Sequence, residues 1–159
     1  MKLKKHSKIL IGIVVAVLLL TGITAGYLQS YYHTDTQAVS AYQYKQNSDT
    51  KIQTKMLSDG SIVCEPENPA AGFIFYPGGK VETSAYEPLM QACAAQDILC
   101  VLVSMPFHLA VFDKNAADGI QEQYPQIDSW YIGGHSLGGA MAASYVSKHA
   151  DSFDGLILL

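Results

Sequence analysis

The order of apolar and polar positions divides the chain into three parts. Residues 9–28 form an apolar run of about twenty residues without a charge, which is the length that a helix needs to span a hydrocarbon core. Residues 29–50 are polar and rich in tyrosine, with no sustained period, and we interpret them as a spacer. Beyond them, short apolar runs alternate with amphipathic stretches and turn signals, so we expect one globular domain at residues 51–159.

The pattern inside this domain predicts strands and helices in alternation. Two loosely alternating segments flank the turn Ser58-Asp59-Gly60-Ser61 and predict a hairpin, at residues 51–57 and 62–65. Continuous apolar runs predict buried strands, at residues 71–76, 98–104, 130–134 and 155–159. Helices are expected between these strands, at residues 84–96, 116–124 and 137–149. This order predicts an α/β fold with a mostly parallel sheet and helices on both faces.

One stretch of this pattern contains candidate chemistry. Residues 130–139 read Trp-Tyr-Ile-Gly-Gly-His-Ser-Leu-Gly-Gly, so a Gly-x-Ser-x-Gly motif joins a predicted strand to a predicted helix. A sharp turn at this point holds a serine hydroxyl exposed beside a base. Gly134 and Gly138 supply space, because a Cβ at either position would clash with the adjacent strand or helix. We interpret Ser136 as a nucleophile and the amide of Leu137 as a hydrogen-bond donor toward an oxyanion.

These residues resemble a known family. Residues 133–142 are similar to the nucleophile elbow of alpha/beta-hydrolase fold enzymes, and residues 75–79 and 104–107 resemble the loops after the two preceding strands in a small, dienelactone-hydrolase-like branch. The resemblance covers about residues 50–159 and does not specify a substrate. It implies a second oxyanion donor in the loop after the first parallel strand, best matched by Gly79. The simpler alternative is that the glycines there only form a turn.

The resemblance also implies a histidine base oriented by an acid, both later in the chain than the serine. The chain ends inside a predicted strand before either segment, so we expect a C-terminally truncated fragment that is inactive alone. Ligand sites in parallel sheets form at the carboxyl ends of the strands, which makes Gly78, His108 and His135 candidate pocket residues. His108 is the first candidate base if these residues contain one.

Composition narrows the function classes. All 10 basic residues are lysine, and the 14 acidic residues all follow residue 31, so the domain is acidic and lacks arginine. Such a domain is a poor candidate for binding nucleic acid. The 3 cysteines, Cys64, Cys93 and Cys100, form no CxxC or Cys/His motif, so we predict no metal site and no cofactor. A disulfide between Cys93 and Cys100 stays open.

Lysines in residues 1–8 precede the apolar run and place this end in the cytoplasm, with the domain outside. The length of the run favours an uncleaved anchor over a cleaved signal peptide with Thr24-Ala25-Gly26 as its cleavage site. We therefore expect a membrane-anchored serine hydrolase that forms an acyl-enzyme with a small ester, lactone or related carbonyl substrate. The alternative is an inactive remnant or a non-catalytic binding module of the same fold. The oligomeric state is left open.

Overall fold

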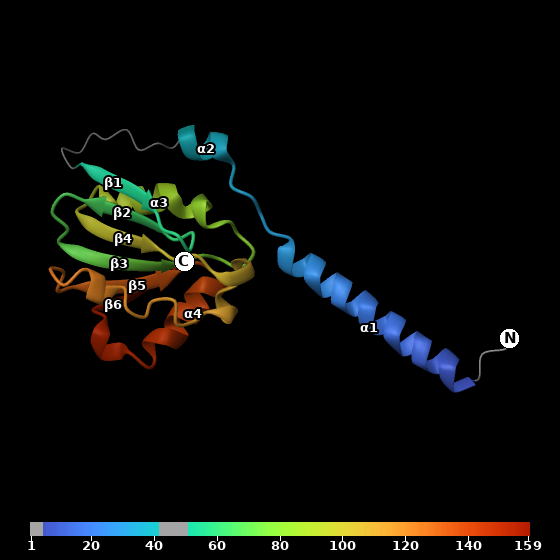
Figure 1. Cartoon of the computed structure of the whole chain (residues 1–159). Helices are drawn as coiled ribbons and strands as arrows, with labels where there is room; N and C mark the ends of the chain where they lie inside the picture. Colours follow the sequence, from blue (N-terminus) through green and yellow to red (C-terminus); the bar gives the residue numbers. More distant parts are fainter. Residues whose placement is uncertain (1–4, 42–50) are drawn as a thin grey trace. The chain divides into compact units, whose positions relative to one another are not determined.

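The computed structural model describes residues 5–41 and 51–159 (Figure 1). Part of the predicted cytoplasmic N-terminus, residues 1–4, and the end of the predicted spacer, residues 42–50, lie outside the described residues. The chain forms two compact units, Met1–Tyr31 and Tyr32–Leu159.

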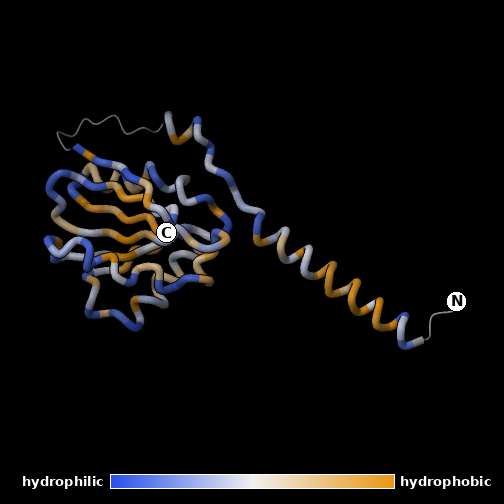
Figure 2. The backbone as a smooth tube through the Cα atoms, in the orientation of Figure 1, coloured by the Kyte–Doolittle hydropathy of each residue, from blue (hydrophilic) through white to orange (hydrophobic). Residues whose placement is uncertain are grey.

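The first unit contains one helix, α1 (Lys5–Gln29). Its segment His6–Gln29 is long and apolar enough to cross a membrane, and a signal sequence near the N-terminus meets the same criteria. Figure 2 shows apolar residues along most of its length. The predicted apolar helix at residues 9–28 is therefore confirmed as a helix, and its anchoring role stays a prediction.

The second unit is built on a six-stranded sheet in the order β1-β2-β4-β3-β5-β6. The strands are β1 (Ile52–Met56), β2 (Ile62–Pro66), β3 (Ala71–Tyr76), β4 (Ile98–Leu102), β5 (Trp130–Gly134) and β6 (Gly155–Leu158). The hairpin β1–β2 joins β4 in antiparallel orientation, whereas β4, β3, β5 and β6 are mutually parallel. The predicted α/β fold with a mostly parallel sheet is thus confirmed.

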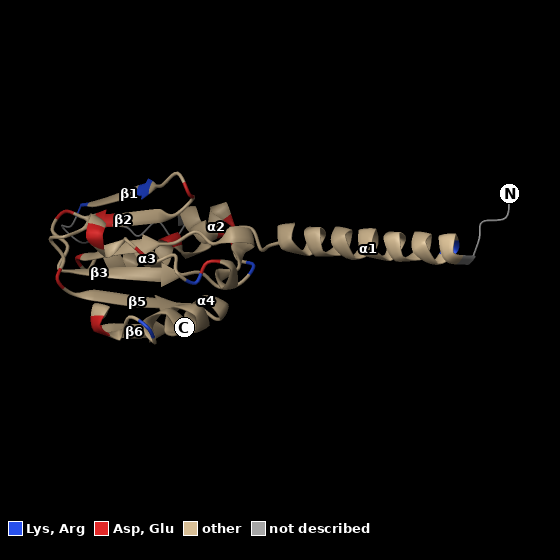
Figure 3. Ribbon diagram, turned by 60° about the horizontal axis from the view of Figure 1, so that its bottom comes forward, with Lys and Arg blue, Asp and Glu red and all other residues tan. Residues whose placement is uncertain are grey.

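Side chains alternate along the central strands and feed two cores, one on each face of the sheet. On one face, Phe73 and Phe75 pack with Met90 of α3 (Glu87–Ala94). On the other face, Ile74 and Tyr76 pack with residues of α4 (Leu137–Val146). None of the four parallel strands contains a charged residue. In Figure 3 the lysine and acidic residues of this unit lie mainly in loops, and β1 and β2 also contain charged residues.

The helix predicted at residues 84–96 begins differently from the expectation. A 3-10 turn at Thr83–Tyr86 precedes α3, which starts at Glu87 and has no side-chain cap. The spacing of Ser84 and Glu87 fits a capping box, but none forms because both side chains have other partners. Ser84 Oγ lies 2.7 Å from Thr34 Oγ1, and the Glu87 carboxylate accepts a hydrogen bond of 2.9 Å from Gln91.

The helix predicted at residues 116–124 is also wrong. This region consists of turns and a short 3-10 helix at Gln121–Gln123. The buried Tyr76 hydroxyl donates to the Lys114 carbonyl and accepts from the Ala117 amide, both at 3.0 Å, which ties the start of this segment to the end of β3. Gly119 then adopts a φ of 72°, which ends any helical path.

Several other elements end earlier in the structure than predicted, and α3 stops at Ala94 rather than at residue 96. The helix after β5 stops at Val146 rather than at residue 149, and β4 stops at Leu102 rather than at residue 104.

Cys64, Cys93 and Cys100 are free thiols, so the disulfide left open between Cys93 and Cys100 is absent from the structure.

Part of the predicted spacer belongs to the second unit. Tyr32 forms a parallel bridge with Val81, and α2 (Thr36–Ala41) follows it. The Asp35 carboxylate accepts hydrogen bonds of 3.0 Å from the Gln37 and Ala38 amides, which is the geometry of an N-cap. We call residues 32–41 the strap.

Candidate active site

Ser136 lies in the turn between β5 and α4, at the carboxyl end of a central strand. It is exposed and has φ 51° and ψ −118°, a region that non-glycine residues rarely adopt. The surrounding backbone leaves no room for extra atoms. A Cβ at Gly134 would lie 2.6 Å from the Tyr76 carbonyl oxygen, and a Cβ at Gly138 would overlap the carbonyl oxygens of Tyr76 and Pro77. The turn therefore requires glycine on both sides of the strained serine.

Hydrogen bonds to neighbouring strands hold this turn. The His135 amide donates to the Tyr76 carbonyl at 3.2 Å, and the Ser136 amide donates to the Leu159 carbonyl at 3.0 Å. The Leu159 amide in turn donates to the Gly134 carbonyl at 3.1 Å. The serine backbone is thus fixed between β3 and the end of β6, so its conformation is set by the sheet.

The loop after β3, residues 77–80, lies against the start of α4. A Cβ on Gly79 would be 3.0 Å from Leu137 Cδ2, which places these two residues in contact. In this loop Pro77 has no amide proton, the Gly78 amide donates to the Tyr86 hydroxyl at 3.1 Å, and the Lys80 amide donates to the His108 carbonyl at 2.6 Å.

The amides of Gly79 and Leu137 have no hydrogen-bond acceptor among the described residues. Leu137 is the first residue of α4. The first amides of a helix have no intrahelical partner, and the helix dipole places partial positive charge at this end. The two amides belong to residues in contact with each other, and Leu137 directly follows Ser136. Their role as oxyanion donors stays a prediction.

Tyr86 connects the loop after β3 to the serine turn. Its hydroxyl oxygen accepts from the Gly78 amide and lies 2.9 Å from His135 Nδ1. A Cβ on Gly78 would come within 2.6 Å of both the hydroxyl and the imidazole nitrogen, so a larger residue there would have to displace both side chains. Burial raises the pKa of Tyr86, which keeps the phenol protonated. The sequence offered no signal for this residue, because it fell inside a predicted helix.

The histidines of the second unit have partners other than the serine. His135 Nδ1 is engaged by Tyr86, and His149 Nδ1 lies 2.9 Å from the Tyr145 carbonyl oxygen. His108 has φ 56°, and its imidazole is hydrogen-bonded to the backbone of Val81. Burial lowers the pKa of His108. No histidine in the described ranges is hydrogen-bonded to the Ser136 hydroxyl.

A cavity of about 180 Å³ opens on the α4 face, near the end of β4, with Ser61, Val103, Ser104 and Asp118 in its lining. Ser136 and the two unpaired amides do not line it, so it is separate from the candidate site. Within residues 5–41 and 51–159, no group of three or more His, Cys, Asp or Glu side chains is placed to hold a metal ion.

Comparison with known proteins identifies the class. Residues 72–159, more than half of the chain, match the sequence model described as the Alpha/beta hydrolase family. The chain therefore belongs to the alpha/beta hydrolase family. No curated protein matches the chain significantly. The dienelactone-hydrolase-like branch suggested by the loops stays a prediction.

Solved structures share this fold. A thermostable carboxyl esterase from Bacillus coagulans is 17% identical with a TM-score of 0.51, and the match covers 69% of this chain and 43% of that one. The virulence factor BioJ from Francisella is 13% identical with a TM-score of 0.55, over 77% and 47% of the two chains. TT1662 from Thermus thermophilus is 16% identical with a TM-score of 0.53, over 68% and 56%. The chain spans about half the length of these proteins, and at such identities the likeness shows the fold alone.

Proposed function

We propose that the chain contributes the nucleophile and the oxyanion site of a serine hydrolase that acts on a small ester, lactone or related carbonyl compound. One observation carries the proposal. Of the residues in the loop after β3, only Gly79 has an amide that no described group accepts, and Gly79 contacts Leu137, the residue after Ser136. Membership of the alpha/beta hydrolase family supports the same reading of Ser136.

In the proposed reaction, the Ser136 hydroxyl attacks the substrate carbonyl while a base takes its proton. The carbonyl oxygen becomes an oxyanion that accepts hydrogen bonds from the Gly79 and Leu137 amides. Collapse of this intermediate expels the alcohol, which receives the proton from the base, and leaves an acyl-enzyme. Water, activated by the same base, then hydrolyses the acyl-enzyme and restores the serine.

The base and its orienting acid belong, in this proposal, to protein beyond residue 159. Two observations support it. No described histidine is hydrogen-bonded to Ser136. β6 also forms an edge of the sheet, and the apolar residues at its end, Ile157, Leu158 and Leu159, are 43–61% exposed. Further strands of a hydrolase sheet would cover these side chains.

We further propose that α1 anchors the protein in a membrane with the second unit outside the cytoplasm. The lysines that precede the apolar segment support this orientation. A cleaved signal sequence, leading to secretion, is the alternative. Immunoblotting distinguishes the two, since cleavage near Ala25 would shorten the product and release it from the membrane fraction.

Ester kinetics test the proposed activity. A chain extended through further strands, an acid and a histidine should hydrolyse p-nitrophenyl acetate and a small lactone. In that protein Ser136→Ala should lower kcat by about 10⁴-fold or more, because it removes the nucleophile. An extended protein that folds but hydrolyses none of these substrates would favour the alternative of a non-catalytic module with the same fold.

A further inference from the structure

The strap is bonded along the loop that follows Gly79. The Tyr32 amide donates to the Lys80 carbonyl at 2.7 Å, and the Glu82 amide donates to the Tyr32 carbonyl at 3.0 Å. Together these bonds form the parallel bridge between Tyr32 and Val81. The backbone from Lys80 to Glu82 is therefore paired with a segment about fifty residues earlier in the sequence.

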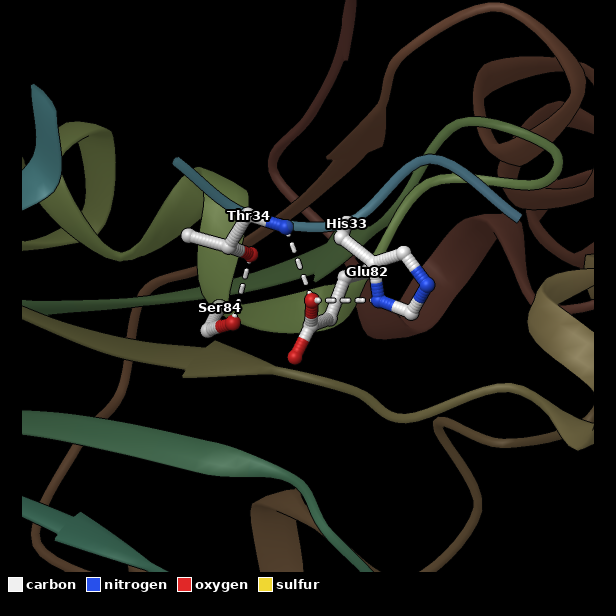
Figure 4. A network of polar contacts seen from close by, with 4 residues as sticks. All are labelled: His33, Thr34, Glu82 and Ser84. Carbon is white, nitrogen blue, oxygen red and sulfur yellow. Dashed lines mark hydrogen bonds and ion pairs between the residues drawn. The ribbon is translucent and has the colours of Figure 1, made fainter. Parts of the chain in front are cut away.

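Side chains of the next residues add further contacts to this backbone pairing (Figure 4). The Glu82 carboxylate accepts a hydrogen bond of 2.7 Å from the Thr34 amide and lies 3.7 Å from His33 Nδ1. The hydroxyls of Thr34 and Ser84 are 2.7 Å apart. The bond from the Thr34 amide is the main reason why the pKa of Glu82 is lowered. A carboxylate that accepts such a bond binds more strongly than a neutral acceptor.

The paired segment is the direct continuation of the candidate oxyanion loop. Gly78 and Gly79 give that loop more conformational freedom than other residues would. The Tyr86 hydroxyl accepts a hydrogen bond from the Gly78 amide, and the His108 carbonyl accepts one from the Lys80 amide. The strap is hydrogen-bonded to the residues that follow, from Lys80 to Ser84. An oxyanion donor must be held within about half an ångström of its productive position, so the constraints at both ends of the loop matter for Gly79.

We propose that the strap is a positioning element of the active site, and that Thr34 and Glu82 hold the loop in the conformation that presents the Gly79 amide. The segment between the apolar helix and the sheet is then part of the catalytic support rather than a passive spacer. This inference rests on the proposed oxyanion role of Gly79. Thr34 and Glu82 act through the loop and do not touch substrate.

Hydrogen–deuterium exchange tests the structural part without requiring activity. In the 159-residue chain in detergent micelles, Glu82→Ala should speed exchange in residues 77–86 by about tenfold, as expected for loss of a bond to a charged group. Exchange in residues 130–146 should stay unchanged. Glu82→Gln keeps an acceptor oxygen and should restore most of the protection. Glu122→Ala, in an exposed 3-10 turn, is the matched control and should change neither region.

Ester kinetics on the extended protein test the positioning part. Glu82→Ala should lower kcat about tenfold with little change in KM, because oxyanion donors act in the transition state, and Glu82→Gln should recover most of kcat. Unchanged exchange in residues 77–86 would overturn the proposal, and so would faster exchange with an unchanged kcat. If the parent extended protein is inactive, the proposed function fails. The exchange result then still decides whether the strap orders the loop.

Discussion

Replacing Ser136 by glycine should make the protein more stable than replacing it by alanine. Both substitutions remove the hydroxyl, which is exposed and forms no capping bond to α4, so its loss costs little in either case. The variants differ in their tolerance of φ 51° and ψ −118°. Glycine adopts this conformation as easily as its mirror image, whereas alanine retains the clash of its Cβ with the backbone.

The size of the difference follows from two opposing terms. A non-glycine residue in such a region costs about 1–3 kcal/mol of folding free energy. Glycine loses about 0.5–1 kcal/mol more conformational entropy on folding than alanine does. The net expectation is that Ser136→Gly exceeds Ser136→Ala in unfolding free energy by roughly 0.5–2 kcal/mol. With an ordinary dependence on urea, the midpoint rises by roughly half a molar.

Urea unfolding in detergent micelles measures this difference through Trp130, the 1 tryptophan in the chain and a buried residue. Ser144, inside α4, provides a control pair in which the sign is reversed. There Ser144→Gly should be about 1 kcal/mol less stable than Ser144→Ala, because glycine is a poor helix former. If Ser136→Gly is no more stable than Ser136→Ala while the Ser144 pair behaves as expected, the strained turn is not a feature of this protein.

Three other changes test separate parts of the structure. Tyr76→Phe should lower the unfolding free energy by about 1–3 kcal/mol in the same urea assay, because it leaves the buried Ala117 amide and the partly buried Lys114 carbonyl without their partner; a loss under about 0.5 kcal/mol would contradict this. The melting temperatures of the parent and Glu82→Gln should differ most above pH 4.5, the ordinary pKa of a glutamate side chain. They should converge as the pH falls through the lowered pKa of Glu82, because the carboxylate is then protonated. Because Glu82 is 35% exposed, that difference should be at most about 2 °C, and a difference that grows in acid would refute it. Protease added to intact cells should remove the second unit and spare residues 1–8, whereas full protection of that unit would reverse the proposed orientation.

The sheet was predictable because its strands are continuous apolar runs bounded by turn residues. Residues 130–134 matched β5, and the hairpin matched β1 and β2 closely. The helix expected at residues 116–124 failed for a tertiary reason. The Tyr76 hydroxyl, about forty residues earlier, bonds to the Lys114 carbonyl and the Ala117 amide and fixes the path of the chain there. A single sequence contains no sign of such a contact.

The candidate site divides in the same way. The elbow was recognisable because its glycines and serine are adjacent in sequence and each has a local steric reason. The meeting of the loop after β3 with the serine turn followed from topology, since parallel strands end at one edge of the sheet, whereas the choice of Gly79 as a donor came from the family resemblance. Tyr86 and the strap were missed, because their hydrogen bonds join loops that the sequence alone does not bring together. The roles of these residues in catalysis stay predictions until they are tested.

Covalent labelling by a fluorophosphonate probe is a direct test of Ser136 as the nucleophile, because the probe reacts much faster with an activated serine than with an ordinary hydroxyl. Three proteins are compared: the 159-residue chain, the chain extended through a histidine and an acid, and the extended chain with Ser136→Ala. We expect strong labelling of the extended chain at Ser136, no labelling of its alanine variant, and little or no labelling of the 159-residue chain, because the proposed base lies beyond residue 159. Strong labelling of the short chain at Ser136 would show that a base lies within these residues, with His108 the first to replace by alanine. An extended, folded chain that is labelled elsewhere or not at all would contradict the assignment of Ser136 as the nucleophile.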